Sequence, residues 1–548
     1  MTALRRHLPR LAIALLALAA TITSLGHQFT YDDRYVVFTN DLVHHLRGLG
    51  RLWSQTYWPA KFGADGYRPV VTTLFTLQWV AGNGSPWVFH LVNILLAVGA
   101  VLSVYWCAAA LLPPGGAWVA AALFAVHPVH VEVTGNIVGQ SELVVAICLT
   151  LAVGLYVRRR LVGGLPGRDA FVILLLFAIA LFTKEHAVVL PALLAAAELT
   201  VIRRDDWRTR LRHARPLALA LVATGLLYLL ARGRVLRDLA GFEPYPIFRY
   251  LHLNAFDRIG TMMTEIPRIA RLLVFPTHLV ADYSPLDVIV ARGADVIQLP
   301  GVMITVGVVV LAVALRRRAP VTSFGLMWLI IAYLPVSNLL VVAGFVTAER
   351  TLFFPSVGVV LVAGAIAHAL LASDEQRHRR LAGLVIGLLL VLGLGRSIVR
   401  QRDWKDNDVF VEALVRDAPL GYRAHFIRGR HYGQKGDLRE MELEYRRAVR
   451  LFPYDAGMTL SIADAYTRAG LCKPATDLFE WTFGVDPTLG EGRYQYVYCL
   501  SRQGRWAEVR AQALIGLPLV PARDSKPMRN AIAEADIALG RRARPAAR

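Results

Sequence analysis

The chain has 548 residues, of which 55% are hydrophobic, and its mean hydropathy is +0.45. A soluble domain of this size is less apolar, so the composition predicts a polytopic membrane protein with a tail of different character. The formal charge of +20 comes mostly from Arg residues at the ends of apolar runs, which is typical of cytoplasmic loops, and nucleic acid is therefore set aside as a partner.

The N-terminus, Met1–Gly26, has a basic start and an apolar run from Leu11. It resembles a signal peptide, but a clean small-x-small cleavage site is missing and many apolar runs follow. We therefore expect an uncleaved signal anchor.

Apolar runs of about 20 residues predict eleven membrane-spanning helices. They lie near residues 10–26, 87–111, 116–131, 141–159, 169–183, 187–202, 215–232, 296–315, 322–342, 353–372 and 380–397. Two further apolar segments, Val70–Val80 and Ile259–Val280, are short or interrupted by charges, which favours re-entrant or interfacial helices.

With eleven spans, most of the basic clusters fall on one side, which predicts a cytoplasmic N-terminus. The membrane would be the inner or plasma membrane of the cell, and the abundance of Ala, Arg and Leu is typical of a bacterium with a GC-rich genome. The tail then lies outside the cytoplasm.

The same topology places six polar segments on the outer side of the membrane. They are Asp32-Asp33, His127–Glu132, Gly139–Glu142, Lys184–His186, Asp282–Ser284 and Ala348–Arg350. Ionisable groups at membrane depth are costly and usually serve a pathway or a site, so six on one side favour a shared cavity. The alternatives are a solvated turn for the acidic pair and helix-end side chains for the others.

Beyond Ile398 a period of 34 residues appears. Pro419, Pro453, Pro487 and Pro521 keep this spacing, and so do Gly436, Gly470 and Gly504. The period predicts tetratricopeptide hairpins, with Gly in the turn between helices and Pro at the end of each unit. The predicted domains are a membrane domain at 1–398, a linker helix at 399–418, and a repeat α-solenoid at 419–540. Such a solenoid binds a peptide or a partner helix, or acts only as a scaffold.

The four cysteines are far apart in sequence, and none shows a zinc-binding spacing. Cys107 and Cys148 lie in apolar runs and are expected to be small core residues. Cys472 and Cys499 lie in the tail, where they could meet in space.

An early acidic pair, multiple spans and a soluble C-terminal domain resemble the GT-C superfamily of lipid-phosphate-sugar glycosyltransferases. Several strings are similar to the TMTC family, the transmembrane and tetratricopeptide-repeat proteins linked to protein O-mannosylation. These strings are Tyr67-Arg-Pro69, Phe89-His-Leu-Val-Asn93, His127-Pro-Val-His-Val-Glu132, Val138-Gly-Gln-Ser-Glu-Leu143, Phe182-Thr-Lys-Glu185, Asp282-Tyr-Ser284, Leu334-Pro-Val-Ser-Asn338, Ala348-Glu-Arg350, Phe354-Pro-Ser-Val-Gly358 and Arg402-Asp-Trp404. The resemblance covers nearly the whole chain; it departs at Gln140, where an Arg is expected.

The resemblance implies transfer of a sugar, expected to be mannose, from a polyprenyl-phosphate donor to a hydroxyl of a protein. A carboxylate must take the hydroxyl proton, and the resemblance favours Asp32, with Asp33 orienting the acceptor or holding a divalent cation. Arg350, Lys184 and Arg68 are candidates for the phosphate.

The remaining candidates would complete the donor site. They are Glu185, Glu142, Asp282, Tyr283, His127, His130 and Glu132. The two histidines could also bind metal together with Asp32 and Asp33, although a His-x-x-His at a helix end is more often structural. Likewise Lys184-Glu185 could be a local ion pair, and Glu349-Arg350 could pair with other loop charges.

Two other functions remain open. One keeps the membrane enzyme but changes the acceptor to a lipid or cell-wall glycan, or the donor to an oligosaccharide. The other is a non-enzymatic, membrane-anchored repeat scaffold.

Overall fold

The computed structural model describes residues 2–59, 65–203, 206–236, 246–286, 288–520 and 522–541. These residues form helices and no β-strand, so the all-α class is confirmed for the described chain. The chain divides into two compact units. The first contains residues 1–243, 259–281 and 294–417, and the second contains residues 244–258, 282–293 and 418–548.

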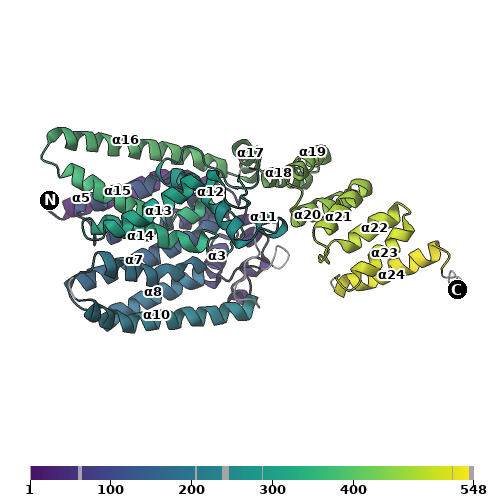
Figure 1. The fold of residues 1–548 in the computed structure, drawn as a ribbon, viewed down its shortest axis with the longest axis horizontal. Helices are drawn as coiled ribbons and strands as arrows, with labels where there is room; N and C mark the ends of the chain where they lie inside the picture. Colours follow the sequence, from purple (N-terminus) through teal and green to yellow (C-terminus); the bar gives the residue numbers. More distant parts are fainter. Residues whose placement is uncertain are drawn as a thin grey trace. The chain divides into compact units, whose positions relative to one another are not determined.

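The first unit is a bundle of long helices (Figure 1). Its α-helices, including α12, which begins in the second unit, are α1 (Thr2–Thr21), α2 (Leu49–Leu52), α3 (Pro69–Gly82), α4 (Pro86–Ala108), α5 (Pro114–Val126), α6 (Val131–Gly135), α7 (Gln140–Val162), α8 (Gly167–Thr183), α9 (Leu190–Thr200), α10 (Trp207–Leu236), α12 (Ala255–Val274), α13 (Leu299–Ala314), α14 (Pro320–Tyr333), α15 (Ser356–Leu371), α16 (Gln376–Gln401) and α17 (Asn407–Asp417). Helices α7, α8 and α10 lie side by side (Figure 1).

Short helical turns lie between these helices, and some of them carry candidate site residues. They are η1 (Ile22–Gly26), η2 (Arg34–Phe38), η3 (Asp41–Val43), η4 (Leu46–Gly48), η6 (Pro128–His130), η7 (Ile137–Gly139), η8 (Glu185–Val189), η9 (Val296–Gln298), η10 (Leu334–Val336), η11 (Glu349–Leu352) and η12 (Arg402–Trp404).

Glycine allows close helix crossings in the first unit. A Cβ on Gly116 of α5 would lie 2.7 Å from the Gly364 carbonyl oxygen of α15, and one on Gly325 of α14 would lie 2.6 Å from the Gly358 carbonyl oxygen of α15. Because no side chain fits at either place, α15 packs backbone to backbone against both neighbours, as helices in membranes commonly do.

All eleven segments expected to span the membrane contain a helix, but their lengths differ from the expectation. Among the described residues, six helices are long and apolar enough to cross a membrane, or seven if the bent pair Pro114–Val126 and Pro128–Gly135 forms one span. Apolar helices α14 and α15 are shorter than a full span. The count of eleven spans and the topology drawn from it therefore stay predictions.

In the second unit, successive helices pack in pairs as three helical hairpins, which follow one another along the unit (Figure 1). Its helices are α11 (Pro246–Tyr250), α18 (Tyr422–Lys435), α19 (Leu438–Leu451), α20 (Ala456–Arg468), α21 (Cys472–Val485), α22 (Arg493–Arg502), α23 (Trp506–Gly516) and α24 (Ala522–Ala538). Gly436, Gly470 and Gly504 stand in the turns of the hairpins with φ of 83°, 76° and 72°. This left-handed conformation favours glycine, which explains why glycine recurs at this position every 34 residues. Pro521, the fourth proline of the period, lies outside the described residues.

Candidate functional site

Asp33 of the acidic pair is fully buried and binds the backbone of a distant turn. Its carboxylate accepts hydrogen bonds from the N–H groups of Val138 at 2.9 Å, Ile137 at 3.2 Å and Thr30 at 3.4 Å. Burial raises the pKa of Asp33 to about 8, against the three N–H donors, which lower it. Both oxygens are therefore engaged, and Asp33 fixes the acidic loop to turn η7.

Asp32 points to another part of the site. Its Oδ2 lies 3.3 Å from Nη1 of Arg350, and 13% of its side chain is exposed to solvent. Since both Asp33 oxygens already accept backbone hydrogen bonds, Asp32 is the member of the pair that a substrate can reach.

Arg350 is held by Glu132 as well as by Asp32. The buried Glu132 carboxylate accepts from Arg350 Nη1 at 2.9 Å and from the Arg350 backbone N–H at 2.8 Å. Burial alone would lower the pKa of Arg350, but the charges of Glu132 and Asp32 raise it, so the guanidinium stays charged. Its Nε and Nη2 have no hydrogen-bond partner in the described chain, and a quarter of the side chain is exposed.

A second group of charges comes from the ends of α3, α7 and α8. Lys184 Nζ lies 2.5 Å from Glu142 Oε1, and His186 Nε2 lies 3.3 Å from the other oxygen of Glu142. Arg68 forms a two-point hydrogen bond with Glu185, at 2.8 and 3.0 Å. Lys184 and Glu185, which could have paired with each other, therefore pair with Glu142 and Arg68, both distant in sequence.

The two groups share one electrostatic environment. The pKa of Lys184 is lowered, first by burial and then by the positive charges of Arg68 and Arg350, although Glu142 opposes the shift. Tyr57 lies between the groups: the Arg68 guanidinium stands 4.6 Å from the centre of its ring, and the charges of Asp32 and Arg350 also act on its hydroxyl. Three cations thus converge on the region that Asp32 faces.

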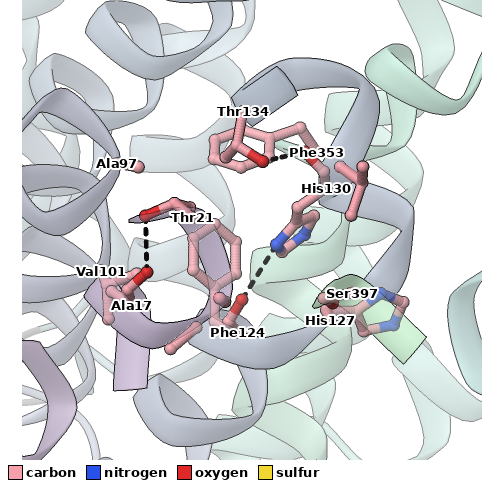
Figure 2. Close-up of a pocket in the computed structure, with 13 residues that line it drawn as sticks. Ala17, Thr21, Ala97, Val101, Phe124, His127, His130, Thr134, Phe353 and Ser397 are labelled. Carbon is pink, nitrogen blue, oxygen red and sulfur yellow. Dashed lines mark hydrogen bonds between the residues drawn. The ribbon is translucent and has the colours of Figure 1, made fainter. Parts of the chain in front are cut away.

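His127 and His130 are bound into the scaffold. His130 uses Nδ1 toward the Phe124 carbonyl at 2.9 Å and Nε2 toward Ser356 Oγ at 2.8 Å, and Figure 2 shows its ring turned toward Phe124. His127 uses Nε2 toward the Leu273 carbonyl at 3.0 Å and Nδ1 toward the Val129 N–H. The two rings line a cavity of about 20 Å³, which has room for about one water molecule (Figure 2).

These contacts do not fit the cation site considered for Asp32, Asp33, His127 and His130. Both histidines use both ring nitrogens, and Asp33 uses both oxygens for backbone donors. Across the described ranges, no group of three His, Cys, Asp or Glu side chains could hold a metal ion. We therefore derive no step through a metal.

Gln140, the departure from the family pattern, forms a neutral pair. Its side chain exchanges hydrogen bonds with Gln78 at 2.8 and 2.9 Å and donates to the Phe89 carbonyl at 3.2 Å. It is fully buried and fully bonded, so no charge is needed at this position.

Asp282 and Tyr283 belong to the second unit. There Asp282 Oδ2 lies 3.0 Å from Nε of Arg423 in α18, and residues 285–286 exchange backbone hydrogen bonds with Leu420 and Tyr422 at the start of α18. Both candidates thus have their described contacts within the second unit, and their part in the donor site stays a prediction.

Sequence reasoning assigned no role to two members of the site. His186 ends the polar segment Lys184–His186, and Tyr57 stands in the aromatic loop before Arg68. The loop's richness in aromatic residues was a usable signal for Tyr57, but its contact with Arg68 depends on the fold.

No family model matches the sequence. Curated relatives do: the mouse protein O-mannosyl-transferase TMTC4 is 24% identical over 78% of this chain, and the Caenorhabditis elegans protein O-mannosyl-transferase F38B6.6 is 26% identical over 80%. Drosophila melanogaster Tmtc2 is 35% identical over 34% of the chain and 21% of its own length. The chain is a relative of the TMTC proteins. The chain covers 64% of TMTC4 and 62% of F38B6.6, so it spans about three-fifths of these relatives.

Among solved structures, the archaeal oligosaccharyltransferase AglB from Archaeoglobus fulgidus, in complex with an inhibitory peptide and a dolichol-phosphate, is 13% identical with a TM-score of 0.40. The match covers 79% of this chain and 59% of AglB. The apolar helices and the TMTC relatives together identify a multi-pass membrane protein.

Proposed function

We propose that the chain is a membrane glycosyltransferase that moves a sugar, mannose, from a polyprenyl-phosphate donor to a hydroxyl of a protein. The names of the TMTC relatives support this reaction. The observation that carries it is the pairing of a reachable carboxylate, Asp32, with a charged Arg350 that keeps unused donors.

Arg350 binds the donor phosphate through Nε and Nη2. A planar guanidinium suits two-point contact with phosphate oxygens, and its Nη1 meanwhile stays with Glu132. Lys184 and Arg68 add positive charge where the leaving phosphate gains negative charge.

Asp32 is the general base. Its contact with Arg350 at 3.3 Å is longer than that of Glu132 at 2.9 Å, so a phosphate on Arg350 would release Asp32 rather than Glu132. The acceptor oxygen bonds to the anomeric carbon as the bond from that carbon to the phosphate oxygen breaks, and the hydroxyl proton passes to Asp32. Asp33 has a positioning role through turn η7.

The three hairpins of the second unit are tetratricopeptide repeats that hold the protein acceptor. Their 34-residue spacing and the left-handed glycines in their turns support this assignment. The inferred arrangement has a cytoplasmic N-terminus and repeats outside the cytoplasm.

The test is transfer of labelled mannose from polyprenyl-phosphate mannose to membrane and secreted proteins by cells expressing the chain. Asp32→Asn should reduce transfer by about 10²-fold or more, the usual contribution of a general base. Asp41→Asn is the matched control, because Asp41 lies in the same loop region with a fully exposed side chain, and it should transfer normally. Full transfer by Asp32→Asn would overturn the assignment of the base.

The same assay separates the alternatives. Label found only in lipid or polysaccharide would favour a glycan acceptor. A cellular phenotype that survives Ala at both Asp32 and Asp33 would favour the non-enzymatic scaffold.

A further inference from the structure

Two cysteines of the second unit meet between neighbouring hairpins. Cys472 begins α21, the second helix of the second hairpin, and Cys499 lies in α22, the first helix of the third. The two helices pack against each other, and both thiols are free.

A shared hydrogen-bond donor fixes the two backbones close together. Nε2 of Gln503 lies 3.1 Å from the Cys472 carbonyl oxygen and 3.2 Å from the Cys499 carbonyl oxygen. The two carbonyl oxygens are therefore no farther apart than the sum of these distances, which brings the backbones of the two cysteines close together.

The side chains also approach each other. The Cys472 thiol lies close enough to Cys499 to raise the pKa of its thiol, and Thr467 Oγ1 lies 3.5 Å from the Cys499 sulfur. The two thiols are therefore neighbours rather than on opposite sides of their helices.

We propose that Cys472 and Cys499 form an intramolecular disulfide that joins α21 to α22 when the chain meets a disulfide oxidant. In the balanced reaction both S–H bonds break, one S–S bond forms between the cysteines, and the oxidant's disulfide is reduced to two thiols. The product ties the second hairpin to the third, and this inference is independent of the proposed transferase activity.

Disulfide exchange proceeds in two steps, through a mixed disulfide with the oxidant, and exposure decides which cysteine reacts first. Cys472 is partly exposed and Cys499 is buried, so the oxidant reaches Cys472 first and forms a mixed disulfide there. Burial, together with the neighbouring thiol of Cys472, raises the pKa of Cys499 to about 12, so closure by Cys499 is the slower step.

The experiment uses the full chain in detergent, treated with oxidised glutathione, blocked with N-ethylmaleimide under denaturing conditions and digested with trypsin. The Lys473–Pro474 bond resists trypsin, so Cys472 falls in peptide 469–493 and Cys499 in peptide 494–502. A species that joins these two peptides, lighter than their sum by two hydrogen atoms, identifies the bond by mass spectrometry. Cys107 and Cys148 fall in other peptides and cannot produce it.

We expect the joined peptides to exceed the glutathione-bound Cys472 by about tenfold or more, because a neighbouring thiol has an effective concentration of at least millimolar. Cys499→Ser should instead trap glutathione on Cys472, and Cys472→Ser should leave Cys499 unmodified. Hydrogen exchange in peptide 494–502 should slow on oxidation and recover on reduction. Wild-type protein that carries glutathione on Cys472 without joined peptides would overturn the proposal.

Discussion

Glu132 offers the sharpest test of how the site is built. Its carboxylate clamps Arg350 at two points, the guanidinium and the backbone N–H, and the Glu132 side chain is fully buried. Replacement by Gln keeps the shape but removes the charge. The amide also carries an NH₂ group that must face one of these two donors, so one hydrogen bond is lost and a donor–donor contact replaces it.

The expected loss follows from these contacts. A hydrogen bond to a charged group contributes about 1.5–3 kcal/mol, and a buried charge left without its partner costs more. If about 2–3 kcal/mol of this loss appears in the transition state, kcat/KM falls by roughly 30- to 150-fold. Because Arg350 binds the donor phosphate in the proposed mechanism, the KM for the polyprenyl-phosphate sugar should rise as well.

The assay is steady-state transfer of labelled mannose by purified protein in detergent, with Glu375→Gln as the matched control. Glu375 is an exposed acid of the same unit, 69% of whose side chain is accessible, and its replacement should leave kcat/KM unchanged. Arg350→Ala combined with Glu132→Gln should be no worse than Arg350→Ala alone, since both changes remove the same interaction. Normal kcat/KM in a folded Glu132→Gln protein, or fully additive losses in the double variant, would refute the reasoning.

Two further predictions test other parts of the site. Burial lowers the pKa of Lys184, so its charge is present below that pKa and is lost as pH rises through it; donor binding should therefore weaken at alkaline pH. Since Arg stays charged, Lys184→Arg should shift the alkaline fall in 1/KM for the donor to higher pH by about one unit or more. A fall that stays at the same pH would exclude Lys184 as its source. Gly139→Ala places a Cβ against the Val133 carbonyl oxygen and should distort the turn that binds Asp33, at a cost of about 1–3 kcal/mol, seen as a lower inactivation temperature and weaker transfer. Gly115→Ala, where a Cβ meets nothing within 4 Å, is the control, and equal behaviour of the two variants would contradict the packing argument.

Local patterns predicted most of the helices. Apolar runs marked a helix at each of the eleven places, because burial in an apolar medium acts on each segment separately. Their lengths were less well predicted: α9 has only 11 residues, and turns η6 and η8 occupy chain that the apolar runs assigned to the ends of membrane-spanning helices. Breaks of this kind depend on side-chain hydrogen bonds from elsewhere in the fold.

The 34-residue period was more reliable. Glycine recurs wherever the backbone must adopt a left-handed turn, and this is a local requirement that sequence carries directly. The three hairpins of the second unit follow from it. The assignment of Asp282 and its neighbours to that same unit could not be read from sequence, since it depends on an ion pair with Arg423 and on backbone pairing across a long separation.

The sequence by itself determined that this is a helical, membrane-spanning chain with a repetitive tail, and that an acidic pair precedes a loop rich in aromatic residues. Only the tertiary structure distinguished the two acids. Asp33 meets the backbone of η7 and Asp32 meets Arg350, because adjacent side chains on a short turn point in different directions. The tertiary structure also determines the partners of Lys184, Glu185 and Arg350. A partly buried charge pairs with the group that the fold brings within reach rather than with its neighbour in sequence.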